Sequence, residues 1–96
     1  MSDEEIIARR LRIAGRVQGV CYRDSMHRQA ESLSVKGWVK NLEDGRVEAW
    51  VEGSSINVDA IIAWARQGPS LALVEEVLIE VVVPSAYRGF AVLQSQ

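Results

Sequence analysis

The chain has 96 residues, 48% of them hydrophobic and 25% charged, which is the balance of one ordinary globular domain. Its net charge of −2 excludes a general electrostatic attraction to nucleic acid or to an anionic membrane. One cysteine excludes an internal disulfide, and no apolar run approaches the roughly 20 residues of a membrane-spanning helix. We therefore expect a single cytoplasmic domain over residues 1–96, in which residues 1–6 form a flexible extension. We also expect a monomer that binds neither nucleic acid nor membrane.

The first third of the sequence predicts a strand, a loop and a helix. Residues 7–13 alternate between an apolar and a polar side, which is the pattern of a half-buried strand. Residues 15–21 break this alternation, and Gly15 and Gly19 suit a loop whose backbone adopts conformations that other residues resist. Apolar residues then recur at helical spacing, which predicts a helix over residues 22–33.

The remainder predicts a hairpin, a second helix and two further strands. Asp44-Gly45 is a strong hairpin signal between two strands, and Ser54 or Ser55 can cap a helix that Gly68-Pro69 ends. The four strands are expected at residues 36–41, 46–52, 73–83 and 87–93. The order of elements predicts an α+β, ferredoxin-like split βαβ sandwich, an antiparallel sheet with two helices on one face. Because this fold hosts many activities, function must be argued from a site.

The segment between the first strand and the first helix has the character of an anion site. The first N–H groups of a helix have no internal partners and carry partial positive charge. A tight glycine-containing loop can turn further N–H groups toward the same point. Arg23, in the first helical turn, adds a planar fork of donors that matches phosphate. The segment runs Gly15-Arg16-Val17-Gln18-Gly19-Val20-Cys21-Tyr22-Arg23.

Asn41 is the second candidate, because it stands at the exit of the second strand, just before the turn. Its carboxamide can face the anion site and hold a water molecule if that strand runs beside the loop. The alternative is that an asparagine next to a turn only caps the turn. From the residues alone both interpretations stay open.

Taken together, the two segments resemble the acylphosphatase family. The family pattern of Gly-Arg-Val-Gln-Gly-Val, two further positions and Arg appears here as Gly15 to Val20, Cys21, Tyr22 and Arg23. A second signature is similar to Gly37-Trp38-Val39-Lys40-Asn41, with Asp44-Gly45, Val47-Glu48 and Gly68-Pro69 at the expected offsets. The resemblance covers about residues 7 to 92. Two positions depart from the pattern: the last strand closes on Leu93 instead of a basic residue, and Asp24 stands beside Arg23.

The resemblance implies an enzyme that hydrolyses acyl phosphates to a carboxylate and inorganic phosphate, without a metal ion or other cofactor. Water would attack phosphorus. Arg23 and Asn41 would be the catalytic residues, one binding the phosphate and the other orienting the water. The phosphate-binding residues would be Gly15, Arg16, Val17, Gln18, Gly19 and Val20.

Other residue types offer weaker alternatives. His27 is the only histidine, no cluster of cysteine and histidine suits zinc, and Cys21 is expected to be at most a redox-sensitive neighbour of the site. A non-catalytic ferredoxin-like module that keeps the anion loop for binding or regulation is the main competing hypothesis. A sheet that binds RNA is disfavoured, because paired aromatic residues that stack bases are missing from the central strands.

Overall fold

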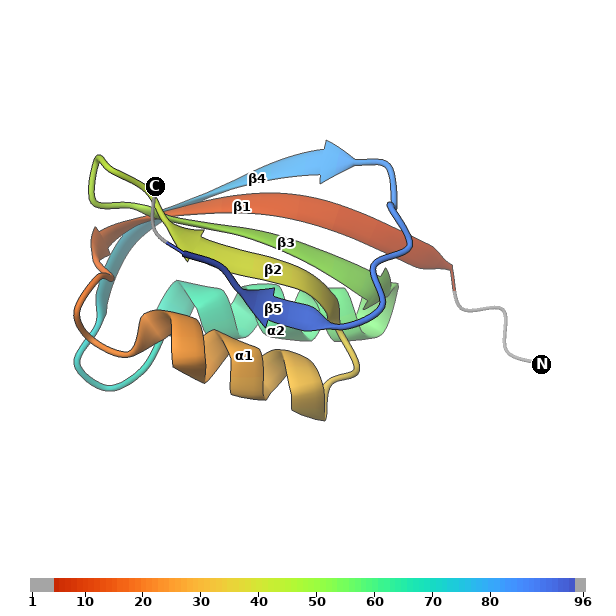
Figure 1. Ribbon diagram of the computed structural model, residues 1–96, viewed down its shortest axis with the longest axis horizontal. Helices are drawn as coiled ribbons and strands as arrows, with labels where there is room; N and C mark the ends of the chain where they lie inside the picture. The colour runs from red at the N-terminus through yellow and green to blue at the C-terminus, as the bar shows by residue number, and fades with distance from the viewer. Residues whose placement is uncertain (1–4, 95–96) are drawn as a thin grey trace.

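The computed structural model describes residues 5–94 and contains five strands and two helices (Figure 1). Their bounds are β1 (Ile6–Arg16), α1 (Tyr22–Ser32), β2 (Lys36–Asn41), β3 (Val47–Ser54), α2 (Ser55–Gln67), β4 (Leu73–Val82) and β5 (Phe90–Val92). Each predicted element is present. β1 runs three residues further than predicted at its end, and β5 is shorter than predicted. The predicted flexible extension over residues 1–6 falls mostly outside the described residues, and Ile6 is already the first residue of β1.

The strands form one sheet in the order β4-β1-β3-β2-β5, and both helices cover the same face (Figure 1). The expectation of a purely antiparallel sheet is wrong, because β5 pairs parallel with β2. The other three pairings are antiparallel, as predicted. They make β2 run opposite to β4. The chain leaves β4 at one edge, turns back through residues 83–89 and enters β5 at the far edge, again opposite to β4. β5 and β2 therefore share a direction.

The core lies between the sheet and the two helices. It contains the apolar side of the strands and the inward stripe of each helix, with Leu11, Met26 and Ile61 fully buried. Tyr22, the first residue of α1, is also buried, and its hydroxyl donates to the carbonyl oxygen of Ala65 in α2 at 2.8 Å. Burial raises the pKa of the Tyr22 phenol far above its usual range, so this donor stays protonated. The bond fixes the start of α1, and with it the loop that precedes α1.

The face of the sheet opposite the helices is polar, and its charges are paired rather than simply solvated. Glu48 of β3 is only 7% exposed. Its carboxylate lies 3.0 Å from Arg12 Nε, and 3.8 Å from both Arg10 Nε and Lys40 Nζ. Three cations from β1 and β2 thus converge on one carboxylate, which accounts for its burial on an otherwise open face.

Glu52, two residues further along β3, fastens the segment that leads to β5. The side chain accepts hydrogen bonds from the backbone N–H groups of Ser85 at 2.8 Å and Ala86 at 2.7 Å, and from the indole of Trp50 at 2.9 Å. Burial alone would raise the pKa of Glu52, but these donors outweigh it and lower the pKa below its usual value. One carboxylate therefore holds the crossover against the sheet.

We expect Glu52→Gln to lower the free energy of unfolding by about 1 to 3 kcal/mol at pH 7, since hydrogen bonds to a charged group are lost. The pKa of Glu52 is lowered on folding. Its contribution is therefore present above the unfolded-state pKa and disappears as pH falls through the folded-state pKa. Urea unfolding followed by tryptophan fluorescence from pH 7 to pH 3 checks this. The wild-type and variant curves should converge at the acid end. Glu43→Gln, at an exposed turn position, is the matched control. A difference that is the same at pH 3 and pH 7 contradicts the assignment.

Candidate active site

The loop between β1 and α1 combines left-handed backbone positions with the start of a helix. Gly19 and Cys21 have φ values of +76° and +64°, whereas the residue between them has a negative φ. Such alternation is typical of backbone concavities that bind anions. The N–H of Ser25 makes the hydrogen bond that opens α1, donating to the carbonyl oxygen of the N-cap residue Cys21 at 3.0 Å. The amides ahead of it therefore lie outside the helical ladder, at the positive end of the helix dipole.

Gln18 anchors this loop to the β2–β3 turn. Its side-chain amide donates to the carbonyl oxygens of Leu42 at 2.8 Å and Arg46 at 2.9 Å. Val17, beside it, is buried in the core. The loop is thus fixed on one side by apolar packing and on the other by two hydrogen bonds, which bring it close to the end of β2. A loop held in this way can present its amides without first being ordered by a ligand.

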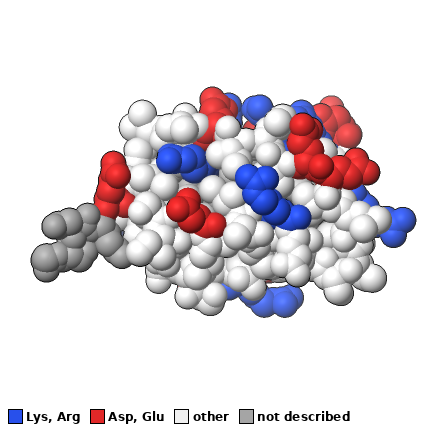
Figure 2. All heavy atoms as spheres, turned by 180° about the vertical axis from the view of Figure 1, so that it is seen from behind, with Lys and Arg blue, Asp and Glu red and all other residues white. Residues whose placement is uncertain are grey.

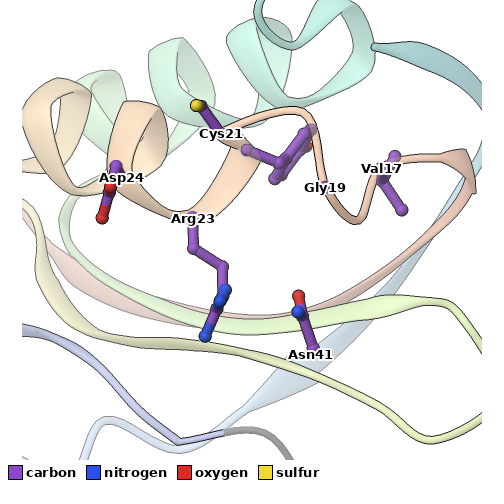
Figure 3. Close-up of a pocket in the computed structure, with 7 residues that line it drawn as sticks. Val17, Gly19, Cys21, Arg23, Asp24 and Asn41 are labelled. Atoms are coloured by element: carbon purple, nitrogen blue, oxygen red, sulfur yellow. The ribbon is translucent and has the colours of Figure 1, made fainter.

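A cavity of about 320 Å³ opens where the loop, the start of α1 and the end of β2 meet (Figure 3). Arg23 and Asn41, the two residues predicted to be catalytic, both line it. The full lining is Val17, Gly19, Cys21, Tyr22, Arg23, Asp24 and Asn41. The structure therefore brings together side chains 18 positions apart in the sequence, as the proposed role of the second strand requires.

Arg23 extends from α1 toward the side of the cavity formed by β2 (Figure 3). Its Nη1 donates to the carbonyl oxygen of Leu93, just beyond β5, at 3.2 Å. Within residues 5–94 no carboxylate lies in salt-bridge range of the guanidinium. The Leu93 bond occupies one of five donors and leaves the positive charge uncompensated, so the side chain is oriented and still available to an anion.

Asn41 ends β2 opposite Val47 of β3, and its side-chain oxygen is buried without a hydrogen-bond partner among the described residues. The neighbouring turn is closed by other groups: the Leu42 N–H donates to the Arg46 carbonyl, and the Arg46 N–H donates to Asp44 Oδ1. The turn therefore does not use the Asn41 carboxamide, and the capping interpretation finds no support. A buried acceptor without a partner is costly, and such an atom in a cavity suits a bound water or ligand.

Four of the six residues predicted to bind phosphate lie outside the cavity wall. These residues are Gly15, Arg16, Gln18 and Val20, whereas Val17 and Gly19 line the cavity. Gly15 lies in β1 with φ +126°, and a Cβ there would come within 2.1 Å of the Leu73 carbonyl oxygen. Its glycine is thus required by the close approach of β4, and a role in phosphate binding stays a prediction. The Leu93 carbonyl is a site contact that the residues did not predict.

Other candidate groups lie apart from this arrangement or add no second function. His27 is not part of the cavity lining, and its Nε2 lies 3.5 Å from Glu31 of the same helix. In the part of the chain that the structure describes, no three His, Cys, Asp or Glu side chains gather closely enough to hold a metal ion. Cys21 is exposed at the cavity, at the N-cap of α1, and its side chain makes no capping bond.

The family model for acylphosphatases matches residues 9–92 of this sequence. The chain belongs to the acylphosphatase family. An acylphosphatase from Thiobacillus denitrificans is 58% identical over 80 residues, which cover 83% of this chain and 89% of the relative. One from Thermococcus kodakarensis is 53% identical over 83 residues, covering 86% and 91%. Family membership thus rests on nearly the full length of both proteins.

Solved structures agree with this assignment. An acylphosphatase from Coxiella burnetii superposes with a TM-score of 0.90 at 34% identity, covering 97% of this chain and all of that one. Full-length HypF also matches with a TM-score of 0.90 at 30% identity, but only 12% of its length is covered. The same architecture therefore occurs both in small acylphosphatases and as a minor part of a larger protein. Neither helix of residues 5–94 is long and apolar enough to cross a membrane.

Proposed function

We propose that this chain hydrolyses acyl phosphates to a carboxylate and inorganic phosphate, with water attacking phosphorus and without a metal ion. Membership of the acylphosphatase family supports the reaction. The observation that carries the division of roles is the pairing in one cavity of an uncompensated guanidinium, from Arg23, with an unpartnered buried oxygen, from Asn41. One suits a phosphate and the other suits a water.

Phosphate binding is assigned to Arg23 and the loop amides. The substrate phosphate carries negative charge on its non-bridging oxygens, and that charge is spread over three of them as the bond to the leaving group breaks. Donors that are already fixed around the site lower the barrier, because they need not reorganise during the reaction. The anchoring of the loop by Gln18 supports this form of catalysis.

Asn41 is assigned to the attacking water. A water molecule that donates one proton to the Asn41 oxygen keeps its lone pairs free, and one can point at phosphorus. An amide does not accept a proton at neutral pH, so Asn41 orients the nucleophile and does not deprotonate it. The proton passes to a phosphate oxygen as the bond to phosphorus forms, which leaves hydrogen phosphate as product.

The chemistry needs no general acid. The bond that breaks joins phosphorus to a carboxylate oxygen, and the conjugate acid of this leaving group has a pKa of about 4. The leaving group departs as a stable anion without protonation. Phosphoryl transfer depends mainly on positioning and on stabilisation of charge, so one arginine, one asparagine and a loop of amides are sufficient.

We place this reaction in the cytoplasm, in a monomeric protein that acts on small molecules and not on nucleic acid. The single cysteine and the absence of a strongly basic composition support this setting. Seen from behind, basic and acidic side chains are interspersed and form no continuous positive surface on that face (Figure 2).

The wild-type protein should release phosphate from benzoyl phosphate at the same rate with and without EDTA. The assay follows the loss of ultraviolet absorbance of the acyl phosphate, and inorganic phosphate is measured in parallel. Turnover that stops with EDTA and returns with Mg²⁺ would reject the metal-free mechanism. Binding of inorganic phosphate without any turnover would instead favour a non-catalytic anion-binding module.

A further inference from the structure

Asp24 is a charged residue in the wall of the active-site cavity that the proposed mechanism does not use. It follows Arg23 directly in α1, and its side chain is exposed. Successive residues of a helix are rotated by about 100°, so Asp24 and Arg23 do not face the same point. In agreement, no ion pair joins Asp24 to a basic side chain among residues 5–94. Its negative charge is therefore not ion-paired with the phosphate-binding arginine.

Asp24 and Asn41 both line the cavity and lie on opposite sides of Arg23 (Figure 3). In phosphoryl transfer the attacking and leaving oxygens stand roughly in line on opposite sides of phosphorus. If the water is held at Asn41 and the phosphate at Arg23, the leaving group extends away from Asn41. The acyl group therefore extends toward the side of the cavity where Asp24 lies.

Apart from Arg23, no other charged side chain among the described residues lines the cavity with Asp24. Val17, Gly19 and Tyr22 are uncharged, and Arg23 is engaged by the phosphate. We propose that Asp24 selects substrates by the charge of the acyl group. Acyl phosphates with a neutral or cationic acyl group are accepted, whereas those carrying a second negative charge are disfavoured. This inference rests on the proposed acyl phosphate hydrolysis and adds the class of acyl group to it.

The expected selectivity is modest, because Asp24 is exposed and water screens its charge. Two like charges that face one another across a wet cavity change a rate by about threefold to fivefold at low salt. The effect should shrink as ionic strength rises, because the screening length falls to about 8 Å at physiological salt. This dependence on salt separates a charge effect from a change in the shape of the pocket.

Three substrates that share one aromatic scaffold test the proposal: benzoyl phosphate, 4-carboxybenzoyl phosphate and 4-(trimethylammonio)benzoyl phosphate. For each, kcat/KM is measured at low and high salt for the wild type and for Asp24→Asn, which removes the charge and keeps the shape. Asp59→Asn removes the same charge from an exposed position of α2 that lies outside the cavity, and serves as the control.

We expect Asp24→Asn to raise kcat/KM for the anionic substrate relative to benzoyl phosphate by about threefold to fivefold at low salt, and to lower it for the cationic one. Asp59→Asn should leave both ratios unchanged. Equal ratios in Asp24→Asn and wild type would overturn the inference while hydrolysis of benzoyl phosphate itself persists. Absence of turnover with all three substrates would instead reject the proposed function on which it rests.

Discussion

Arg23→Ala should lower kcat/KM for benzoyl phosphate by about 10³-fold, the scale on which a transition-state arginine acts in phosphoryl transfer. The side chain is the one basic group that lines the cavity, and its guanidinium has no carboxylate partner among the described residues. Arg23→Lys should recover only a small part of the loss, because an ammonium keeps the charge but not the planar fork. Steady-state kinetics and competitive inhibition by inorganic phosphate measure both effects.

A loss of activity in Arg23→Ala must be separated from a loss of structure, because the guanidinium also donates to the Leu93 carbonyl beyond β5. One exposed hydrogen bond contributes about 1 to 2 kcal/mol, so the variant should stay folded, with a urea midpoint only modestly below that of the wild type. Arg28→Ala removes an exposed arginine of the same helix, outside the cavity, and should retain full activity. Phosphate inhibition that is as tight in Arg23→Ala as in wild type would contradict the assignment.

The sequence predicted the elements well because their signals are local. Alternation marked the strands, helical spacing marked α1 and α2, and Asp44-Gly45 marked the hairpin. The direction of β5 carries no such signal. A three-residue strand has no pattern that distinguishes parallel from antiparallel pairing, and its direction follows from where residues 83–89 cross the molecule. That path in turn depends on Glu52, whose hydrogen bonds to the backbone of Ser85 and Ala86 have no local signal in the sequence.

The part of the candidate site that depends on the chemical type of a side chain could be predicted from the sequence. A glycine-containing loop before a helix and an arginine in its first turn indicate an anion site, and the resemblance chose between the two interpretations of Asn41. Contacts through backbone carbonyls leave no such trace, so the bond from Arg23 to Leu93 could not be anticipated from residues 70 positions apart. Gly15 is a case in which the residue type was given the wrong structural reason. Its type suggested a loop, whereas its neighbours are the backbone of β4.

Asn41→Ala should lower kcat by about 10² to 10³-fold, the cost of removing one well-placed polar group from a transition state. Binding of inorganic phosphate should stay close to wild type, because the loop amides and Arg23 are untouched. Asn41→Gln keeps the amide and moves it by one methylene. It should remain slow, since displacing a reacting group by about 1 Å can cost 10²-fold. Single-turnover kinetics, with phosphate inhibition measured in parallel, separates these effects.

Stability gives an independent test of the same residue. The Asn41 oxygen is buried without a protein partner among the described residues, so alanine in its place breaks no hydrogen bond to that oxygen within this part of the protein. We therefore expect the free energy of unfolding of Asn41→Ala to match or exceed that of the wild type, while its activity falls. Asn57→Ala, at an asparagine outside the cavity, should keep its activity. If Asn41 were structural, its loss would lower stability and phosphate binding together. A more stable and less active variant is the expected signature of a polar group retained for catalysis against the preference of the fold.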